Sequence, residues 1–186
     1  MAERKNPAPF LTEVQVAKRV KELGESITKD LKGKPLVCIG VLKGSFIFFA
    51  DLVRQIHLPL SIDFIRASSY GNKTTSSGSV KISFDLSLSI EEKHVLLIED
   101  IVDTGLTLRH LLDHLKHRNP KSLRLCVLLL KPGKLYKPVP IDYLGFTIDD
   151  RFVVGYGLDA GEKYRNLPYV ASLSTSRRKK SRSEEE

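Results

Sequence analysis

Acidic residues and threonines gather at a point where an apolar run gives way to a short turn. Residues 95–98 are all apolar, and they are followed by Glu99, Asp100, Asp103, Thr104, Gly105 and Thr107. A short, continuous apolar run is typical of a strand that is buried on both faces. Ligands of open α/β sheets bind beyond the carboxyl ends of such strands, so we expect a ligand site at this turn.

The turn is suited to a phosphate group. A helix is predicted from residue 106 to 117, so free backbone N–H groups at its start would face an anion. The phosphate-binding set would run from Asp103 and Thr104 through Leu106 to Thr107, with two threonine hydroxyls among its donors. Gly105 would let the backbone approach the anion closely.

The three acids need a different partner from the phosphate. Adjacent Glu99 and Asp100 are suited to ribose hydroxyls and to Mg²⁺, a hard ion that prefers oxygen ligands. Asp103 remains as a candidate proton acceptor. The alternative is a strand end with solvated acids, in which Asp103 merely caps the following helix.

The rest of the chain alternates between predicted strands and helices. Helices are expected at 12–31 and 46–53, in addition to 106–117, and strands at 36–42, 60–65, 95–98, 123–130, 143–146 and 152–156. This order indicates an α/β fold with a mostly parallel sheet covered by helices on both sides. Nine of the twelve residues 68–79 are Ser, Thr or Gly, which indicates a lid loop. Polar and apolar residues alternate over 79–84, so this segment is expected to be a strand of that lid.

Composition limits the class of protein. The chain has 186 residues, of which 41% are hydrophobic and 28% charged, so one domain over residues 1–176 is expected. No apolar run reaches the roughly 20 residues of a membrane helix, and the polar N-terminus does not resemble a signal peptide. Cys38 and Cys126 lie in apolar runs and are expected to be free thiols, which favours the cytoplasm.

The net charge of +8 allows a nucleic acid, an anionic membrane or a phosphate-rich ligand as partner. The segment 177–186 holds five basic residues and three glutamates, and we expect it to be a disordered, solvated tail. A tail of this kind could also bind RNA.

Three histidines are spaced as metal ligands sometimes are. His110, His114 and His117 share one face of the predicted helix with Asp113. That face lies opposite the leucine stripe and among basic residues, so a solvated polar face is expected instead.

The stretch 95–108 resembles the phosphoribosyl-pyrophosphate (PRPP) binding motif of type I phosphoribosyltransferases, and it is most similar to the hypoxanthine-guanine branch of bacterial enzymes. The resemblance extends over roughly residues 10–173. Residues 41–45, with Lys43 and Gly44, look like the pyrophosphate loop, where the family has a cis peptide that would fall here at Leu42–Lys43. Residues 68–71, with Ser69 and Tyr70, look like the flexible lid. Residues 130–132 and 151–159 look like the purine-binding hood, and residues 162–168 look like the segment that follows it.

The resemblance also implies individual roles. Lys131 would donate to O6 of a purine, Phe152 would stack on its ring, and Val153 would read its edge with backbone atoms. Asp159 would lie at the purine site and help Glu99 and Asp100 to hold Mg²⁺, and Arg165 would contact pyrophosphate. The family often has lysine where this chain has Arg151, which leaves the local contacts near the base open.

The activity implied is transfer of phosphoribosyl from PRPP to N9 of hypoxanthine or guanine, giving IMP or GMP and pyrophosphate, with Asp103 as the catalytic base. Family members are commonly homodimers or homotetramers.

A xanthine-preferring transferase remains open, as does a non-catalytic PRPP- or nucleotide-sensing protein that binds RNA. A Walker A loop is absent, and Gly155, Gly157 and Gly161 do not have dinucleotide-binding spacing.

Overall fold

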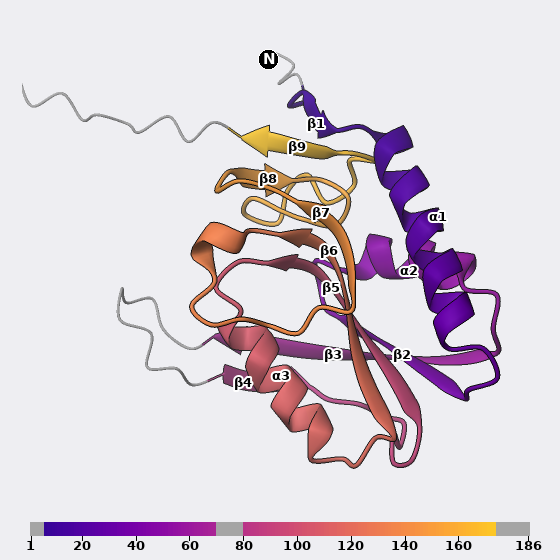
Figure 1. Ribbon diagram of the computed structural model, residues 1–186. Helices are drawn as coiled ribbons and strands as arrows, with labels where there is room; N and C mark the ends of the chain where they lie inside the picture. Colours follow the sequence, from indigo (N-terminus) through magenta and orange to yellow (C-terminus); the bar gives the residue numbers. More distant parts are fainter. Residues whose placement is uncertain (1–5, 70–79, 174–186) are drawn as a thin grey trace, which may run out of the picture.

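The computed structural model describes residues 6–69 and 80–173, and its main element is a six-stranded sheet (Figure 1). The strand order is β4-β3-β2-β5-β6-β7. All neighbouring strands are parallel except β3 and β4, which are antiparallel. The strands are β2 (Leu36–Val41), β3 (Leu60–Ser69), β4 (Val80–Phe84), β5 (His94–Val102), β6 (Ser122–Leu130) and β7 (Tyr143–Thr147).

Helices cover both faces of this sheet. Helices α1 (Glu13–Asp30) and α2 (Phe46–Gln55) lie together on one face, and α3 (Leu106–Lys116) lies on the other (Figure 1). Helix α1 begins with a complete capping box, in which Thr12 and Gln15 satisfy each other's backbone N–H groups. None of the helices in the described part of the chain combines the length and the apolar character of a membrane span.

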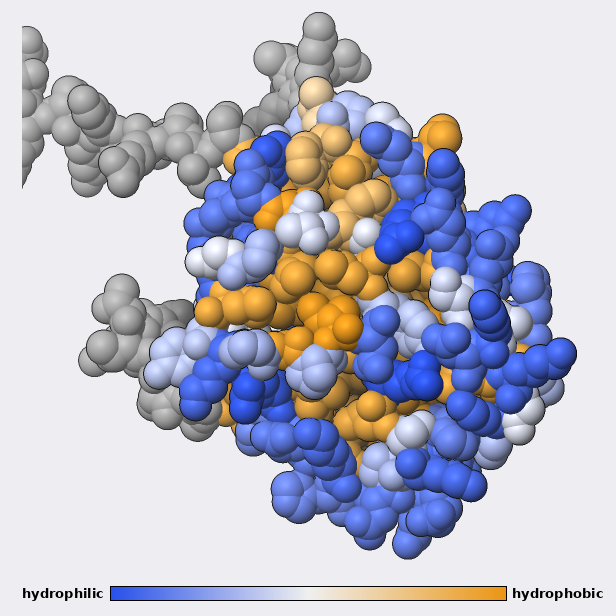
Figure 2. Space-filling model, viewed as in Figure 1, coloured by the Kyte–Doolittle hydropathy of each residue, from blue (hydrophilic) through white to orange (hydrophobic). Residues whose placement is uncertain are grey.

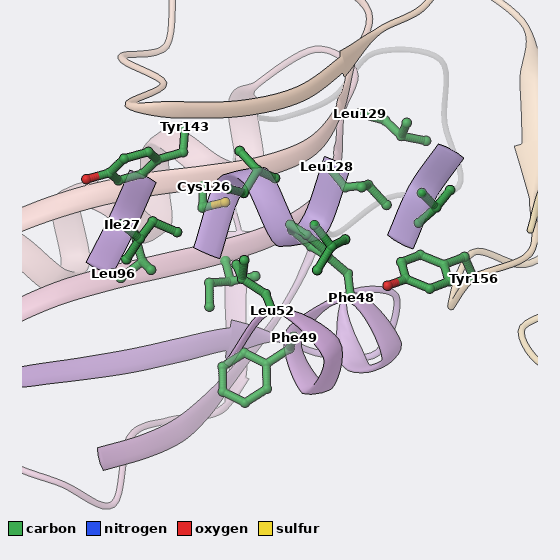
Figure 3. Packing of buried hydrophobic residues seen from close by; sticks show 14 of the residues in the cluster. Ile27, Phe48, Phe49, Leu52, Leu96, Cys126, Leu128, Leu129, Tyr143 and Tyr156 are labelled. Carbon is green, nitrogen blue, oxygen red and sulfur yellow. The ribbon is translucent and has the colours of Figure 1, made fainter. Parts of the chain in front are cut away.

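Alternating residues of the central strands supply two separate hydrophobic cores. Cys38, Leu96 and Leu128 face α1 and α2, where Phe48 and Leu52 fill the space between the helices and the sheet (Figure 3). Their neighbours in sequence face α3 and pack against its leucines: Val37, Ile39, Leu97, Leu125 and Val127. A strand that is buried on both faces must be apolar throughout, which explains the continuous runs in the sequence.

A second, smaller sheet stands beside the carboxyl end of the central one. Its strand order is β1-β9-β8, with β1 (Pro9–Leu11), β8 (Phe152–Val154) and β9 (Val170–Leu173) all antiparallel. The two ends of the described chain therefore meet in this sheet, above the strands of the central sheet in Figure 1. Arg151 lies next to it, with its guanidinium over the Phe10 ring at 3.9 Å.

The predicted fold class is confirmed, but several strands differ from the prediction: β1 and β9 were not predicted, and β8 ends at Val154. Strand β3 is longer than predicted, and β5 continues to Val102 because Ile101 and Val102 still pair with β6. Glu99 and Asp100 therefore lie within the end of β5, and the turn begins at Asp103. Cys38 and Cys126 are free, buried thiols, as expected, and burial raises the pKa of Cys38 to about 12. The tail 177–186 and most of the predicted lid lie outside the described residues.

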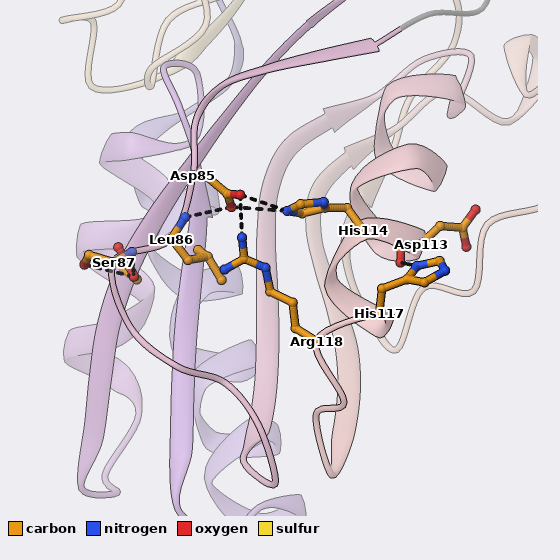
Figure 4. A network of polar contacts seen from close by, with 8 residues as sticks. Asp85, Leu86, Ser87, Asp113, His114, His117 and Arg118 are labelled. Atoms are coloured by element: carbon orange, nitrogen blue, oxygen red, sulfur yellow. Dashed lines mark hydrogen bonds and ion pairs between the residues drawn. The ribbon is translucent and has the colours of Figure 1, made fainter.

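A polar network ties the end of β4 to α3 (Figure 4). The Asp85 carboxylate accepts from the Leu86 N–H at 2.8 Å, lies 3.1 Å from His114 Nε2, and pairs with Arg118. His114 is thus not on a freely solvated face, in contrast to the expectation for the three histidines. Partial burial alone would raise the pKa of Asp85, but these hydrogen bonds and charges lower it below its usual value.

The Asp85 network predicts a pH dependence of stability. Because the folded-state pKa is lowered, the contribution is present above about pH 4 and is lost as the pH falls through the folded-state value. We expect Asp85→Asn to lower the free energy of unfolding by about 1 kcal/mol at pH 7, and the difference from wild type to shrink toward pH 3. Urea unfolding at pH 7 and at pH 3 measures this difference in the free energy of unfolding. The control is Asp113→Asn, which removes an exposed acid. A difference that does not change with pH would contradict this assignment.

Candidate functional site

The predicted turn at the end of β5 lines a cavity of about 250 Å³. The start of α3 forms one wall, and Gly105, with a φ of 78°, is the N-cap of that helix. Asp103 is not the cap of α3, because the N-cap is Gly105 and the Leu106 N–H donates to Thr104 Oγ1 at 3.5 Å, so the alternative in which Asp103 merely caps the helix is wrong. Seven of the predicted residues line the cavity: Gly44, Glu99, Asp100, Asp103, Thr104, Gly105 and Thr107. Leu106, the first residue of α3, is 37% exposed.

Backbone segments meet at Gly44 with no space for a side chain. A Cβ atom on Gly44 would lie 1.9 Å from Asp100 Oδ2, and one on Gly157 would lie 2.0 Å from the Gly44 carbonyl oxygen. The loop between β2 and α2 is thereby held against both β5 and the turn after β8. The Leu42–Lys43 peptide at the start of this loop is cis, as the family resemblance implied.

A second cavity of about 390 Å³ adjoins the first. The two share Gly44, Asp100, Ile101 and Asp103 as a common wall. The second cavity is also lined by the remaining predicted phosphate and base contacts: Lys43, Lys131, Phe152, Val153, Asp159 and Arg165. Residues from distant parts of the sequence therefore line two adjoining cavities.

The two predicted pyrophosphate contacts, Lys43 and Arg165, both pair with acids of this chain. Lys43 Nζ lies 3.0 Å from Glu162 Oε2. Arg165 Nη2 lies 2.7 Å from Asp159 Oδ1 and 3.3 Å from Glu162 Oε2, and its Nη1 donates to the Gly157 carbonyl at 2.7 Å. Both of these cations, which line the second cavity, are thus already paired with carboxylates.

The opposite side of the second cavity holds a buried lysine. The Lys131 side chain is only 8% exposed, and its Nζ lies 3.7 Å from Asp150 Oδ1. Lys134 Nζ lies 2.9 Å from the same Asp150 oxygen and 3.8 Å from Asp103 Oδ2. The other oxygen of Asp103 is buried and has no hydrogen-bond partner among the described residues, so it is available to a ligand.

The two acids at the end of β5 influence each other. Burial raises the pKa of Glu99 well above its usual value, and the neighbouring Asp100 raises it further. Asp100 itself is buried, at 7% exposure, against Gly44. Glu99 is half-buried and lines the first cavity, so hydroxyl donors or a cation bound there would relieve the crowding of the two acids.

The predicted metal ligands are only partly brought together. Glu99 and Asp100 are adjacent, but among residues 6–69 and 80–173 no group of three or more His, Cys, Asp or Glu side chains could hold a metal ion by itself. Asp159 is engaged with Arg165 instead. Of the predicted lid residues, Ser69 ends β3 and Tyr70 lies outside the described residues.

Sequence reasoning missed three charged residues at the site: Lys134, Asp150 and Glu162. The one available signal for Lys134 is the density of lysines between 131 and 137, and for Glu162 its place in the motif at 162–168. Neither signal indicates the oppositely charged residue with which each of them forms an ion pair.

The fold and the two adjoining cavities define an α/β protein whose site, at the carboxyl edge of its sheet, is suited to a phosphorylated ligand. The family model for the phosphoribosyl transferase domain matches residues 10–160. The chain belongs to the phosphoribosyltransferase family.

Several similar proteins are named hypoxanthine-guanine phosphoribosyltransferase. A hypoxanthine-guanine phosphoribosyltransferase of Dictyostelium discoideum is 54% identical over 168 residues, covering 88% of this chain and 93% of that protein. The protein of that name from Staphylococcus aureus is 50% identical over 164 residues, covering 88% and 92%. A crystal structure of a Bacillus anthracis hypoxanthine-guanine phosphoribosyltransferase superposes with a TM-score of 0.87 at 47% identity, covering 91% of this chain and 99% of that one.

The close approach at Gly44 predicts a sensitive position. In Gly44→Ala the new Cβ would collide with the Asp100 carboxylate, so the loop or the acid must move. We expect phosphoribosyltransferase activity to fall by about 10²-fold, because a shift of about 1 Å at a site of this kind has that effect. The matched control is Gly133→Ala, where a Cβ meets nothing within 4 Å. Equal kcat/KM values for the two variants would show that the contact is unimportant.

Proposed function

We propose that this enzyme transfers 5-phosphoribosyl from PRPP to N9 of hypoxanthine or guanine, forming IMP or GMP and pyrophosphate. The observation that carries the proposal is the shared wall of the two cavities, where Asp100 and Asp103 face a phosphate-type cradle on one side and a base-type pocket on the other. A sugar bound over this wall would have its phosphate in one cavity and its reacting carbon toward the other.

The first cavity supports binding of the 5-phosphate. Thr104, Gly105, Leu106 and Thr107 contribute hydroxyls and the N–H groups at the start of an eleven-residue helix, with the dipole of α3 directed at the anion. In this proposal Glu99 and Asp100 accept hydrogen bonds from the ribose hydroxyls. Lys43, Gly44 and Arg165 bind the pyrophosphate that leaves.

The second cavity supports binding of a 6-oxopurine. Lys131 is an ammonium donor in a buried position, and a 6-oxo group accepts from it while the 6-amino group of adenine does so poorly. A site built around a buried donor rejects bases that leave it unpaired. Phe152, 45% exposed at the edge of β8, would stack on the base, and buried Val153 would present backbone atoms to it.

The chemical step needs a proton acceptor and charge neutralisation. As the bond to pyrophosphate breaks, positive charge develops on the sugar carbon and negative charge on the leaving oxygens. Lys43 and Arg165 would neutralise those oxygens, and Asp103, with one oxygen unpartnered, would accept the proton from N7 of the purine.

A divalent cation fits the donors at the end of β5. Mg²⁺ is commonly bound by one or two carboxylates together with substrate phosphates, and half-buried Glu99 and buried Asp100 are two adjacent acids of this kind. When bound there, Mg²⁺ would supply positive charge against the pyrophosphate oxygens. A part for Asp159 remains a prediction, since it would have to leave Arg165.

The proposal keeps the other expectations drawn from the family: a cytoplasmic enzyme, acting on small molecules as a homodimer or homotetramer. A preference for xanthine differs only in the groups that meet the 2-position of the base. RNA binding by the tail 177–186 lacks support, because that segment lies outside the described residues.

Product formation with separate purines tests the function. The protein is incubated with PRPP, Mg²⁺ and one of hypoxanthine, guanine, xanthine or adenine, and the nucleotide formed is measured. We expect IMP and GMP, and at least about 10⁴-fold lower kcat/KM with adenine because of Lys131. No product with any base would rule out the enzyme, and XMP as the main product would favour the xanthine alternative.

Asp103→Asn tests the proton acceptor. The amide keeps the size of the side chain but cannot accept the proton, so kcat with hypoxanthine should fall by about 10²-fold or more with little change in melting temperature. Asp113→Asn, an exposed acid on α3, is the matched control and should keep full activity. Near-native turnover in Asp103→Asn would show that another group takes the proton.

A further inference from the structure

One carboxylate oxygen of this chain lies between the two cations assigned to pyrophosphate. Glu162 Oε2 is 3.0 Å from Lys43 Nζ and 3.3 Å from Arg165 Nη2. Lys43 comes from the loop after β2 and Arg165 from the segment before β9, 122 positions later. The two cations converge on this single oxygen as they would on an oxygen of a bound phosphate.

The backbone is shaped to hold Glu162 at this place. Its φ is 63°, in the left-handed region, and Gly161 before it has a φ of 60°. The Glu162 N–H donates to Asp159 Oδ2 at 2.8 Å, while the other oxygen of Asp159 pairs with Arg165. Asp159 therefore links the backbone of Glu162 to Arg165, the same arginine that the Glu162 side chain contacts.

Exposure distinguishes the two acids at this cation pair. The side chains of Asp159 and Arg165 are 29% and 20% exposed, whereas Glu162 is 66% and Lys43 is 47% exposed. The Glu162 side chain therefore reaches the cations from the solvent side and has room to swing away. The more buried Asp159–Arg165 pair has less room to move.

We propose that Glu162 is a built-in competitor of pyrophosphate: its carboxylate occupies the Lys43–Arg165 pair when the site is empty and must leave before a diphosphate binds there. The proposal rests on the function proposed above, which assigns this pair to pyrophosphate. The competition weakens the binding of the diphosphate end of PRPP and speeds the departure of pyrophosphate, because a replacement anion is already attached to the chain.

A different role for Glu162 predicts the opposite result. If the carboxylate served to hold Lys43 and Arg165 in position for the substrate, its removal would weaken anion binding. If it were a surface ion pair without function, its removal would change nothing. The direction of the change in affinity therefore decides between these roles.

The experiment measures pyrophosphate binding by calorimetry, without divalent cations, to wild type, Glu162→Gln and Glu162→Ala. We expect both variants to bind about threefold to tenfold more tightly than wild type, the range that two partly exposed ion pairs supply. The matched control is Glu25→Gln, another exposed glutamate beside a lysine, located on α1 away from both cavities. It should bind like wild type, and melting temperatures should be unchanged in all variants.

Kinetics provide a second readout. KM for PRPP and the inhibition constant of pyrophosphate should both fall in Glu162→Gln by a similar factor. If the Glu162 variants bind pyrophosphate no more tightly than wild type, the competitor role is wrong. That result would leave the proposed function unaffected. A wild-type protein that neither binds pyrophosphate nor turns over PRPP would instead overturn the proposed function, and the competitor role with it.

Discussion

The structure depends on the contact between Gly44, the Asp100 carboxylate and Gly157. A Cβ atom on Gly44 would collide with the Asp100 side chain, and a Cβ atom on Gly157 would collide with the Gly44 carbonyl oxygen. Gly44 follows β2, Asp100 lies at the end of β5, and Gly157 follows β8, so the contact joins the central sheet to the small sheet. Because both cavities include Gly44 and Asp100 in their walls, the same contact sets the distance between the phosphate-type cradle and the base-type pocket.

The central sheet provides the stiffness that this contact requires. Strands β2 and β5 lie side by side with apolar residues on both faces, one face packed against α1 and α2 and the other against α3. A core packed on both sides resists small displacements, since each shift opens space on one face and crowds the other. Acidic side chains at the end of β5 can therefore be held close to each other, at a free-energy cost that the two cores offset. The polar hydroxyls and N–H groups at the start of α3 lie next to these acids.

Features set by local sequence could be predicted, and features set by distant pairs could not. The runs that form β2, β5 and β6, the leucine stripe of α3 and the capping residue Thr12 all act over a few neighbouring residues. By contrast, β1 and β9 have only three and four residues and exist because they pair with each other across almost the whole chain. The site residues between Glu99 and Thr107 were predicted from their local pattern, whereas the roles of Lys131, Phe152, Val153, Asp159 and Arg165 came from the family resemblance, which already contains such distant relations.

The unpredicted ion pairs change how the positive charge of the site should be understood. The net charge of +8 is consistent with a phosphate-rich ligand, yet Lys43, Lys131 and Arg165 each have an acid of the same chain within 4 Å. A ligand phosphate thus meets paired cations, and its net binding energy is the difference between two sets of ion pairs, not the full attraction of exposed charges. Such an exchange keeps an empty site electrically balanced. With pyrophosphate bound by Lys43 and Arg165 as proposed, the same exchange would help both substrate and pyrophosphate to dissociate, which a reversible transfer requires.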